Sequence, residues 1–260
     1  MKRLAVTADD FGLDRKLDEG IRLAFTEGIV THVSLVANGD AFEEAVSFLK
    51  KHTGIIASAH LNLTDGRPLS HHKDIQRLLN SEGNFLGSHW RVVWILLRVT
   101  DLFEAVEMEY RMQIERILSA GIKIWQLNCH GHLHALPAVF RLVVQLALSY
   151  KIPYVRVVQE YRGLKVSLLS AGFRMGRWQT PKARRIQLNG CLGVSDSGHL
   201  DEKRLREILR RRPEGFSELI CHPGRSDKNL EARYPWNYHW EKELALLTST
   251  KAKNLIKRFL

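Results

Sequence analysis

The sequence predicts an α/β domain in which mostly parallel strands form a barrel-like arrangement under a layer of helices. Short apolar runs with strand character alternate with segments of helical periodicity, which is typical of βαβ units. Polar residues able to do chemistry recur where these runs end. We find no internal repeat, low-complexity tract or linker in the 260 residues. The sequence therefore predicts a single domain.

The alternation is regular in the first quarter of the chain. A short buried strand at 4–8 leads into Asp9-Asp10-Phe11-Gly12, and a helix follows from Asp14 with Gly28 as its stop signal. The next expected elements are a strand at 33–37, a helix at 41–51 and a strand at 55–63. The alternation then pauses over residues 65–100, which contain a loop and an apolar segment at 89–98.

The pattern resumes with a long helix near 102–120, closed by Gly121. The further expected elements are a strand at 124–130, a helix at 137–150, a strand at 154–158, a helix at 200–212, a strand at 217–221 and a helical tail from about 238. Residues 161–195 fit neither periodicity and carry seven Lys and Arg, but no Asp or Glu. We interpret 65–100 and 161–195 as variable insertions or lid segments.

Composition limits the classes of function. Hydrophobic residues at 45% and charged residues at 26% exclude a disordered or fibrous chain. The net charge of +11 favours anionic partners such as nucleic acid, phosphates or an acidic membrane surface. Three cysteines without a C-x-x-C pair exclude a disulfide scaffold. The start is not a signal peptide, and no stretch is apolar enough to span a bilayer. We expect a cytoplasmic protein.

Four strand ends carry groups that bind metals or transfer protons. They are Asp9-Asp10, His60, His130 and Cys221-His222. Because ligands of parallel α/β folds bind outside the carboxyl ends of the strands, these groups are expected on one face. Two imidazoles and one carboxylate suit a catalytic divalent metal, and Asp10, His60 and His130 would supply them. The second carboxylate, Asp9, is then free to act as a base, provided that the strand turns at this point.

Each feature also has a simpler interpretation. An Asp-Asp pair is commonly a turn or a helix cap, and a single histidine at a strand end is commonly a packing residue. In His130-Gly131-His132-Leu133-His134, three histidines at alternate positions would share one face of an extended segment. His132 and His134 would then contact substrate, support the metal ligands or simply be exposed. The conjunction of these features, rather than any one of them, favours an active site.

Seven motifs of the chain resemble the YdjC-like carbohydrate deacetylases, a family with chitooligosaccharide deacetylases and hopanoid-biosynthesis-associated relatives. The motifs occur in the order and spacing of the family. They are Thr7-Ala8-Asp9-Asp10-Phe11-Gly12, Gly28-Ile29-Val30-Thr31, Val36-Ala37-Asn38-Gly39, His60-Leu61-Asn62-Leu63-Thr64, Cys129-His130-Gly131-His132-Leu133-His134, Ile152-Pro153-Tyr154-Val155-Arg156 and Cys221-His222-Pro223-Gly224. The resemblance implies one YdjC-like deacetylase domain over 1–260, with a modified (β/α) barrel fold.

The resemblance also implies an activity, which is hydrolysis of the N-acetyl group of an amino sugar on an oligosaccharide or a lipid-linked glycan. It implies a divalent metal bound by Asp10, His60 and His130. Asp9 matches the catalytic base of the family, His222 the position of a general acid, and Arg156 an arginine beside the site. Zn²⁺ is the expected ion and Mg²⁺ the alternative, because affinity and availability both decide which metal binds.

The chain departs from the family at Gly131, where His, Gln or Lys is more usual. This departure concerns local substrate contacts rather than the metal ligands. Segments 65–100 and 161–195 match the family poorly, so the identity of the sugar cannot be transferred.

Two segments suggest an additional surface. Trp90 and Trp94 lie four residues apart in an apolar stretch that Arg91 and Arg98 flank, and 161–195 is strongly cationic. The simpler interpretations are a buried helix or a homodimer interface for the first segment, and a solvated loop for the second. The functional interpretation is a lid, or a surface that meets lipid. Together they suggest an amino sugar on a lipid carrier, handled by peripheral contact with an anionic membrane at the inner face.

Two other function classes remain. Another metal-dependent hydrolase, a phosphoesterase or a glycosidase, could use the same site, although a glycosidase more usually shows two separated carboxylates. A nucleic-acid-binding protein would suit the charge, but no binding motif is present and the basic residues are widely spread. We therefore expect no nucleic acid partner.

Overall fold

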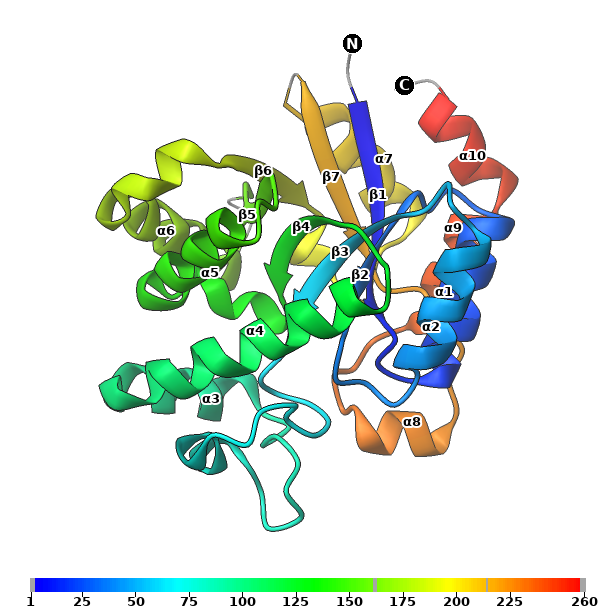
Figure 1. The fold of residues 1–260 in the computed structure, drawn as a ribbon. Coiled ribbons are helices and arrows are strands. Elements are labelled where there is room, and N and C mark those ends of the chain that lie inside the picture. The colour runs from blue at the N-terminus through cyan, green and yellow to red at the C-terminus, as the bar shows by residue number, and fades with distance from the viewer. Residues whose placement is uncertain (1–2, 161–162, 214, 258–260) are drawn as a thin grey trace.

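A computed structural model describes residues 3–160, 163–213 and 215–257 of the chain. Its parallel strands close into one barrel in chain order, with β7 paired to β1 (Figure 1). The strands are β1 Arg3–Phe11, β2 His32–Leu35, β3 Ile56–Leu61, β4 Ile124–Cys129, β5 Tyr154–Val158, β6 Gln187–Leu192 and β7 Phe216–Cys221. The predicted α/β barrel is confirmed.

Helices surround the barrel and fill most of the connections. The α-helices are α1 Arg15–Thr26, α2 Phe42–Lys51, α3 His89–Arg98, α4 Phe103–Ser119, α5 Pro137–Ser149, α6 Leu164–Gln179, α7 Glu202–Arg211, α8 Lys228–Arg233, α9 Trp240–Thr248 and α10 Thr250–Lys257. Short 3₁₀ helices are η1 Lys73–Leu78, η2 Thr100–Leu102, η3 His130–Ala135, η4 Pro181–Arg185 and η5 Val194–Asp196. In the described residues, every helix is too short or too polar to cross a bilayer.

The first turn of α1 shows how local signals position the first strand end. Asp14 is the N-cap and accepts a hydrogen bond from the Lys16 amide at 2.8 Å. Asp18, one turn later, is buried and accepts from the Gly12 amide at 2.7 Å. These bonds fix the path of the chain between the end of β1 and the helix, next to Asp9 and Asp10.

Residues 161–195 contain two elements that the sequence pattern did not predict, α6 and β6. Gln187, Asn189 and Gly190 interrupt the apolar run of β6, which removes the usual strand signal. Asn189 is nevertheless buried, because its amide donates to the Gln126 side chain at 2.8 Å. Of the basic residues noted in this segment, Arg162 lies outside the described residues.

The expectation that residues 130–134 are extended is wrong. They form η3, in which Gly131 and His132 have φ of 60° and 57°. Positive φ turns the chain sharply, and glycine adopts it at little cost. The three histidines therefore do not alternate as they would along an extended strand.

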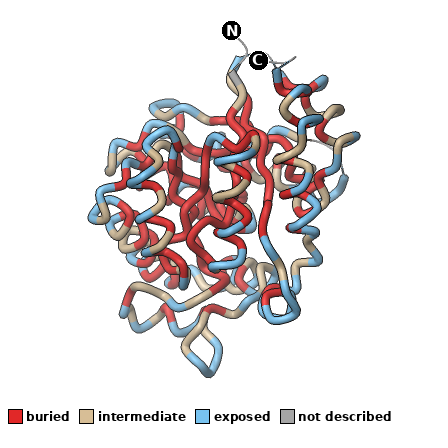
Figure 2. Tube along the Cα trace, turned by 90° about the vertical axis from the view of Figure 1, so that its right-hand side faces the viewer, coloured by how far each residue is buried: buried red, intermediate tan, exposed pale blue. Residues whose placement is uncertain are grey.

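The apolar core lies between the barrel and its helices, and the centre of the molecule is buried throughout (Figure 2). Buried polar side chains lie inside the barrel among these apolar residues. The three cysteines are free and buried.

Candidate metal centre

Three side chains from three strand ends meet at the carboxyl end of the barrel. Asp10 lies near the end of β1, His60 lies in β3, and His130 directly follows β4. The Asp10 Oδ1 atom is 2.7 Å from His130 Nδ1 and 3.3 Å from His60 Nε2. The two ring nitrogens are 3.3 Å apart. All three residues are buried, and they form a group that could hold a metal ion.

The spacing of these atoms fits a divalent cation. Ligands about 2.0–2.1 Å from a tetrahedral zinc ion lie about 3.3 Å from one another. Octahedral ligands at about 2.0–2.1 Å, as magnesium requires, lie about 2.9 Å apart. The observed 2.7–3.3 Å covers both cases. The residues thus fit a metal without distinguishing between the two ions.

His60 is oriented from behind by Asn128. The Asn128 Oδ1 atom contacts His60 Nδ1, which leaves Nε2 directed at Asp10 and His130. The Asn128 amide in turn donates to the Ser34 hydroxyl at 3.1 Å. Support of this kind fixes the tautomer and the ring orientation of a metal-binding histidine.

The backbone brings both aspartates to the same region. The register of β1 against β2 shifts between Ala8 and Phe11, and Asp10 has φ of 69°. Left-handed backbone is uncommon for a residue other than glycine, although aspartate tolerates it better than most. The turn predicted at this point is therefore present. It lets Asp10 meet the histidines while Asp9 meets Arg156.

Arg156 of β5 forms a buried ion-pair network with two carboxylates. Its guanidinium contacts both Asp9 oxygens, at 2.6 and 2.9 Å. It also contacts both Glu218 oxygens, at 2.7 and 3.1 Å. Glu218 of β7 accepts further hydrogen bonds from Thr7 and Gln126. Such planar, bidentate pairing matches the rigid geometry of a guanidinium.

The network keeps Asp9 ionised. Burial by itself would raise the pKa of Asp9, but Arg156, with His60 and His222 nearby, holds that pKa well below its usual value. Arg156 thus fixes the orientation and charge of Asp9, while it also makes this carboxylate a weaker base.

His222 follows β7, which is adjacent to β1 in the barrel. Its backbone N–H donates to Glu243 of α9 at 2.7 Å, and the Leu200 amide donates to the other Glu243 oxygen at 3.0 Å. Burial raises the pKa of Glu243. The His222 Nδ1 atom is buried and has no hydrogen-bond partner among the described residues. The position of His222 is therefore fixed through its backbone.

The two remaining predicted histidines lie further along η3. His134 Nε2 donates to the Arg156 carbonyl at 3.0 Å, and burial lowers the pKa of His134 to about 3. His134 is therefore neutral near pH 7 and supports the strand that carries Arg156. Burial also lowers the pKa of His132, whose Nδ1 has no hydrogen-bond partner in the part of the chain that the structure describes.

Sequence reasoning missed three aromatic neighbours of the site. The rings of His89 and Trp236 each lie 5.0 Å from the His130 ring, and the Tyr238 ring lies 4.9 Å from His222. The aromatic run Tyr234-Pro-Trp-Asn-Tyr-His-Trp was a signal that could have indicated the second and third. His89 had no local signal, since it belongs to the poorly matched segment 65–100.

His89 occupies the space beside Gly131. A Cβ atom on Gly131 would lie 1.8 Å from Cδ2 of His89, so a side chain at position 131 and this placement of His89 exclude each other. The departure from the family at Gly131 thus accompanies a histidine supplied by α3.

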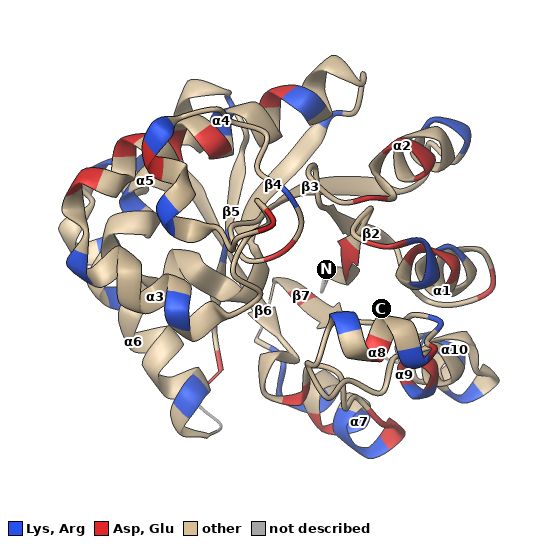
Figure 3. Ribbon diagram, turned by 90° about the horizontal axis from the view of Figure 1, so that it is seen from below, with Lys and Arg blue, Asp and Glu red and all other residues tan. Residues whose placement is uncertain are grey.

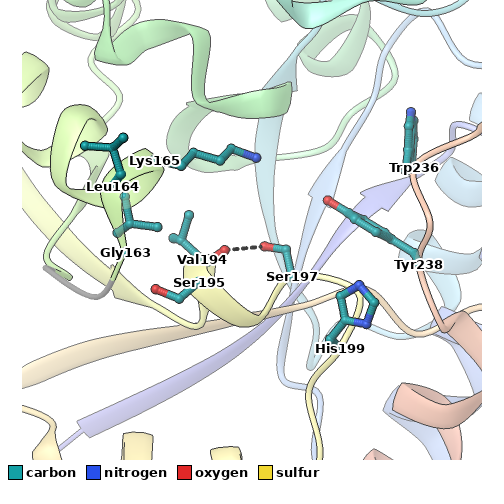
Figure 4. A pocket seen from close by; sticks show the side chains of 10 residues that line it. Gly163, Leu164, Lys165, Val194, Ser195, Ser197, His199, Trp236 and Tyr238 are labelled. Atoms are coloured by element: carbon teal, nitrogen blue, oxygen red, sulfur yellow. Dashed lines mark hydrogen bonds between the residues drawn. The ribbon is translucent and has the colours of Figure 1, made fainter.

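A cavity of about 360 Å³ opens beside the centre (Figure 4). This volume lies within the usual range for small-molecule sites. Its walls come from the start of α6, from η5 and the loop after it, and from Trp236 and Tyr238. Lys165 and the Tyr238 hydroxyl point toward one another across the cavity in Figure 4. The cavity shares Trp236 and Tyr238 with the surroundings of His130 and His222.

Comparison with known proteins shows similarity over the whole described chain. A family model described as YdjC-like protein matches residues 3–258. A carbohydrate deacetylase of Clostridium beijerinckii is 28% identical over 260 residues, which cover 98% of this chain and 94% of the relative. A carbohydrate deacetylase of Geobacillus stearothermophilus is 32% identical over 245 residues, with coverages of 94% and 88%.

A solved structure from Enterococcus faecalis, described as a cellobiose-phosphate cleavage protein, has a TM-score of 0.81. It is 20% identical and covers 99% of this chain and 94% of its own. At this identity the likeness supports the barrel fold alone. The enzyme class predicted from the motifs, a carbohydrate deacetylase, agrees with the name that the sequence relatives share.

Proposed function

This chain belongs to the YdjC-like protein family, and from that premise we propose a metal-dependent hydrolase that removes the N-acetyl group of an amino sugar. The observation that carries the proposal is the buried group of Asp10, His60 and His130 beside a second, separately held carboxylate, Asp9. The relatives named carbohydrate deacetylase support the class of substrate.

The metal would be held by Asp10, His60 and His130. When bound, a divalent cation polarises a carbonyl group and lowers the pKa of water, which an unreactive acetamide requires. Zn²⁺ is our proposed ion, because two imidazoles and one carboxylate match catalytic zinc sites, and Mg²⁺ is the alternative.

Asp9 is the proposed base. As water attacks the acetyl carbon, a lone pair of the Asp9 carboxylate accepts its proton. Arg156 occupies one direction of each Asp9 oxygen and keeps the group ionised and in place. Arg156 is therefore a positioning residue, and His134 supports the strand that carries it.

His222 is the proposed acid. The carbon–nitrogen bond breaks only if the departing nitrogen gains a proton, since an amide anion is a very poor leaving group. An imidazolium at His222 would donate that proton, and the products are acetate and the free amino sugar. The neighbouring ring of Tyr238 and the hydrogen bond from the His222 backbone to Glu243 hold His222 in place. His132 stays a weaker candidate for contact with substrate.

The test is release of acetate from N-acetylglucosamine, diacetylchitobiose and a lipid-linked N-acetylglucosamine, each with zinc, with magnesium and with a chelator. We expect release from at least one sugar, abolished by the chelator and restored by added metal. His130→Ala should lose both bound metal and activity. His71→Ala, which changes an exposed histidine outside the centre, is the matched control and should behave like the parent protein.

Two outcomes would contradict the proposal. Full activity in chelator, with no metal in the protein, would exclude metal dependence. Bound metal without acetate release from any sugar would exclude the substrate class, and hydrolysis of a phosphate ester or a glycoside under the same conditions would then identify another metal hydrolase.

A further inference from the structure

Helix α6 has two apolar faces. Its inner face packs on the barrel layer through Val166 and Phe173, with the small Gly176 against Phe140. At about 100° per residue, a second set of apolar residues lies within about 80° of arc on the opposite side. This outer set is Leu164, Leu168, Met175 and Trp178. Leu164 and Trp178 are 78% and 83% exposed.

Helix α3 repeats the arrangement. Val92 and Leu96 are buried, and on the opposite side an apolar stripe faces solvent. The stripe consists of Trp90, Trp94 and Leu97. The Arg98 guanidinium covers the Trp94 ring at 4.1 Å from its centroid. A surface helix normally turns polar residues outward, so two helices with apolar outer faces need an explanation.

Most of the exposed large hydrophobic side chains lie in these two stripes. In the described part of the chain, ten large hydrophobic side chains are exposed, and seven of them lie on α3 and α6. The charges beside them have one sign: residues 89–98 and 164–185 contain eight Lys and Arg and no Asp or Glu. We call the outer faces of α3 and α6 with these basic residues the apolar-basic surface. Seen from below, both helices lie on one flank of the barrel (Figure 3).

The apolar-basic surface adjoins the cavity. Leu164 and Lys165 at the start of α6 line the cavity, and Leu164 also begins the outer stripe. The ring of His89, at the start of α3, lies 5.0 Å from the ring of His130. Both helices also contact η3, which carries the metal ligand His130. Anything that covers this surface therefore lies beside the entrance of the candidate site.

We propose that the apolar-basic surface docks on an anionic lipid bilayer. Tryptophan prefers the membrane–water interface, and flanking Lys and Arg are attracted by acidic headgroups. A second copy of the chain fits less well, because a symmetric contact would bring like charges together without acidic partners on these segments. Nucleic acid would satisfy the charge but would leave the apolar stripes unused. The proposal does not depend on the deacetylase chemistry.

The test is sedimentation of the full chain with vesicles, without substrate. Vesicles of phosphatidylcholine alone are compared with vesicles containing one third phosphatidylglycerol, at low and at high salt. We expect binding to the acidic vesicles that weakens as salt screens the charges, and little binding to the neutral ones. The Trp90→Ala/Trp178→Ala variant should bind the acidic vesicles at least about tenfold more weakly, since two exposed aromatic anchors are lost.

Matched controls separate this surface from general stickiness. Met108→Ala/Leu118→Ala removes two exposed apolar side chains of α4, which is not part of the apolar-basic surface, and should leave binding unchanged. Arg177→Glu/Lys182→Glu should weaken binding by about thirtyfold or more, since each basic residue near an acidic membrane contributes about 1 kcal/mol. Lys203→Glu/Arg210→Glu on α7 should have a much smaller effect.

Three outcomes would overturn the proposal. They are failure to bind acidic vesicles at low salt, equal binding by the tryptophan variant and its control, and a stable dimer that the tryptophan variant dissociates. The last result would assign the surface to a second copy. Acetate release from a soluble sugar is measured separately, so failure of membrane docking and failure of the proposed function are distinguishable.

Discussion

The interior of the barrel and the outer faces of α3 and α6 both reverse the usual distribution of polar and apolar groups. Inside, Arg156, Asp9 and Glu218 are charged and fully enclosed. Outside, Trp90 and Trp178 are apolar and largely exposed. The interior charges are paired with one another, whereas the residues that the structure describes cover these exposed rings only slightly.

The two regions differ in whether they need a partner. A buried charge that is paired within the protein needs no partner molecule, and its position is fixed by its hydrogen bonds. An exposed apolar stripe gains stability only when another surface covers it. Changes inside should therefore affect folding, metal binding or turnover, while changes outside should affect association alone.

The largest effect is expected for Asp9→Asn. Loss of a positioned base should reduce turnover about 10²–10⁴-fold, because the attacking water keeps its proton. Metal content should stay at the parent level, since Asp9 is outside the ligand group. Steady-state acetate release together with metal analysis by mass spectrometry measures both. Turnover at the parent rate would show that Asp9 is not the base.

Arg156→Met tests the interior network through stability. It leaves two buried carboxylates without their cation, which should cost about 3–5 kcal/mol of the free energy of unfolding. Urea unfolding at pH 7 measures this. Arg206→Met, which breaks a partly exposed pair with Glu202 on α7, should cost at most about 1 kcal/mol. Equal costs for the two variants would contradict the assigned importance of the buried network.

Asn128→Ala probes the support of a metal ligand. Without the contact to His60 Nδ1, the imidazole loses its fixed orientation, and metal affinity should fall about 10–100-fold. Competition with a chromophoric chelator measures that affinity. Asn189→Ala, another buried asparagine in the barrel, is the matched control and should bind metal as the parent does. An unchanged affinity in Asn128→Ala would remove Asn128 from the metal centre.

The smallest effect on folding and turnover is expected for changes to the exposed tryptophans. Trp90→Ala/Trp178→Ala should change the free energy of unfolding by no more than about 0.5 kcal/mol, because exposed side chains contribute little to folding. Its acetate release from a soluble sugar should equal that of the parent. Thermal unfolding and the acetate assay provide the two values. A marked loss of stability would mean that these rings pack in the folded chain after all.

Much of the site was predictable because strand ends are visible in the sequence and topology brings them together. Asp10, His60 and His130 each end an apolar run, and parallel strands place such ends on one face. The motif match agreed with the base role already inferred for Asp9, and it added roles for Arg156 and His222. Of these six residues, Arg156 is the one whose contacts, with Asp9 and Glu218, carry no local signal at all.

The order of most strands and helices, the α/β class and the candidate ligands could be predicted from the sequence alone. Those features depend on periodicity and on local capping, which are properties of neighbouring residues. Only the tertiary structure decided that Glu243 holds His222, that His89 occupies the space at Gly131, and that α6 turns an apolar stripe to solvent. Periodicity shows that a helix has two apolar faces, but which face is buried depends on packing against residues distant in the chain.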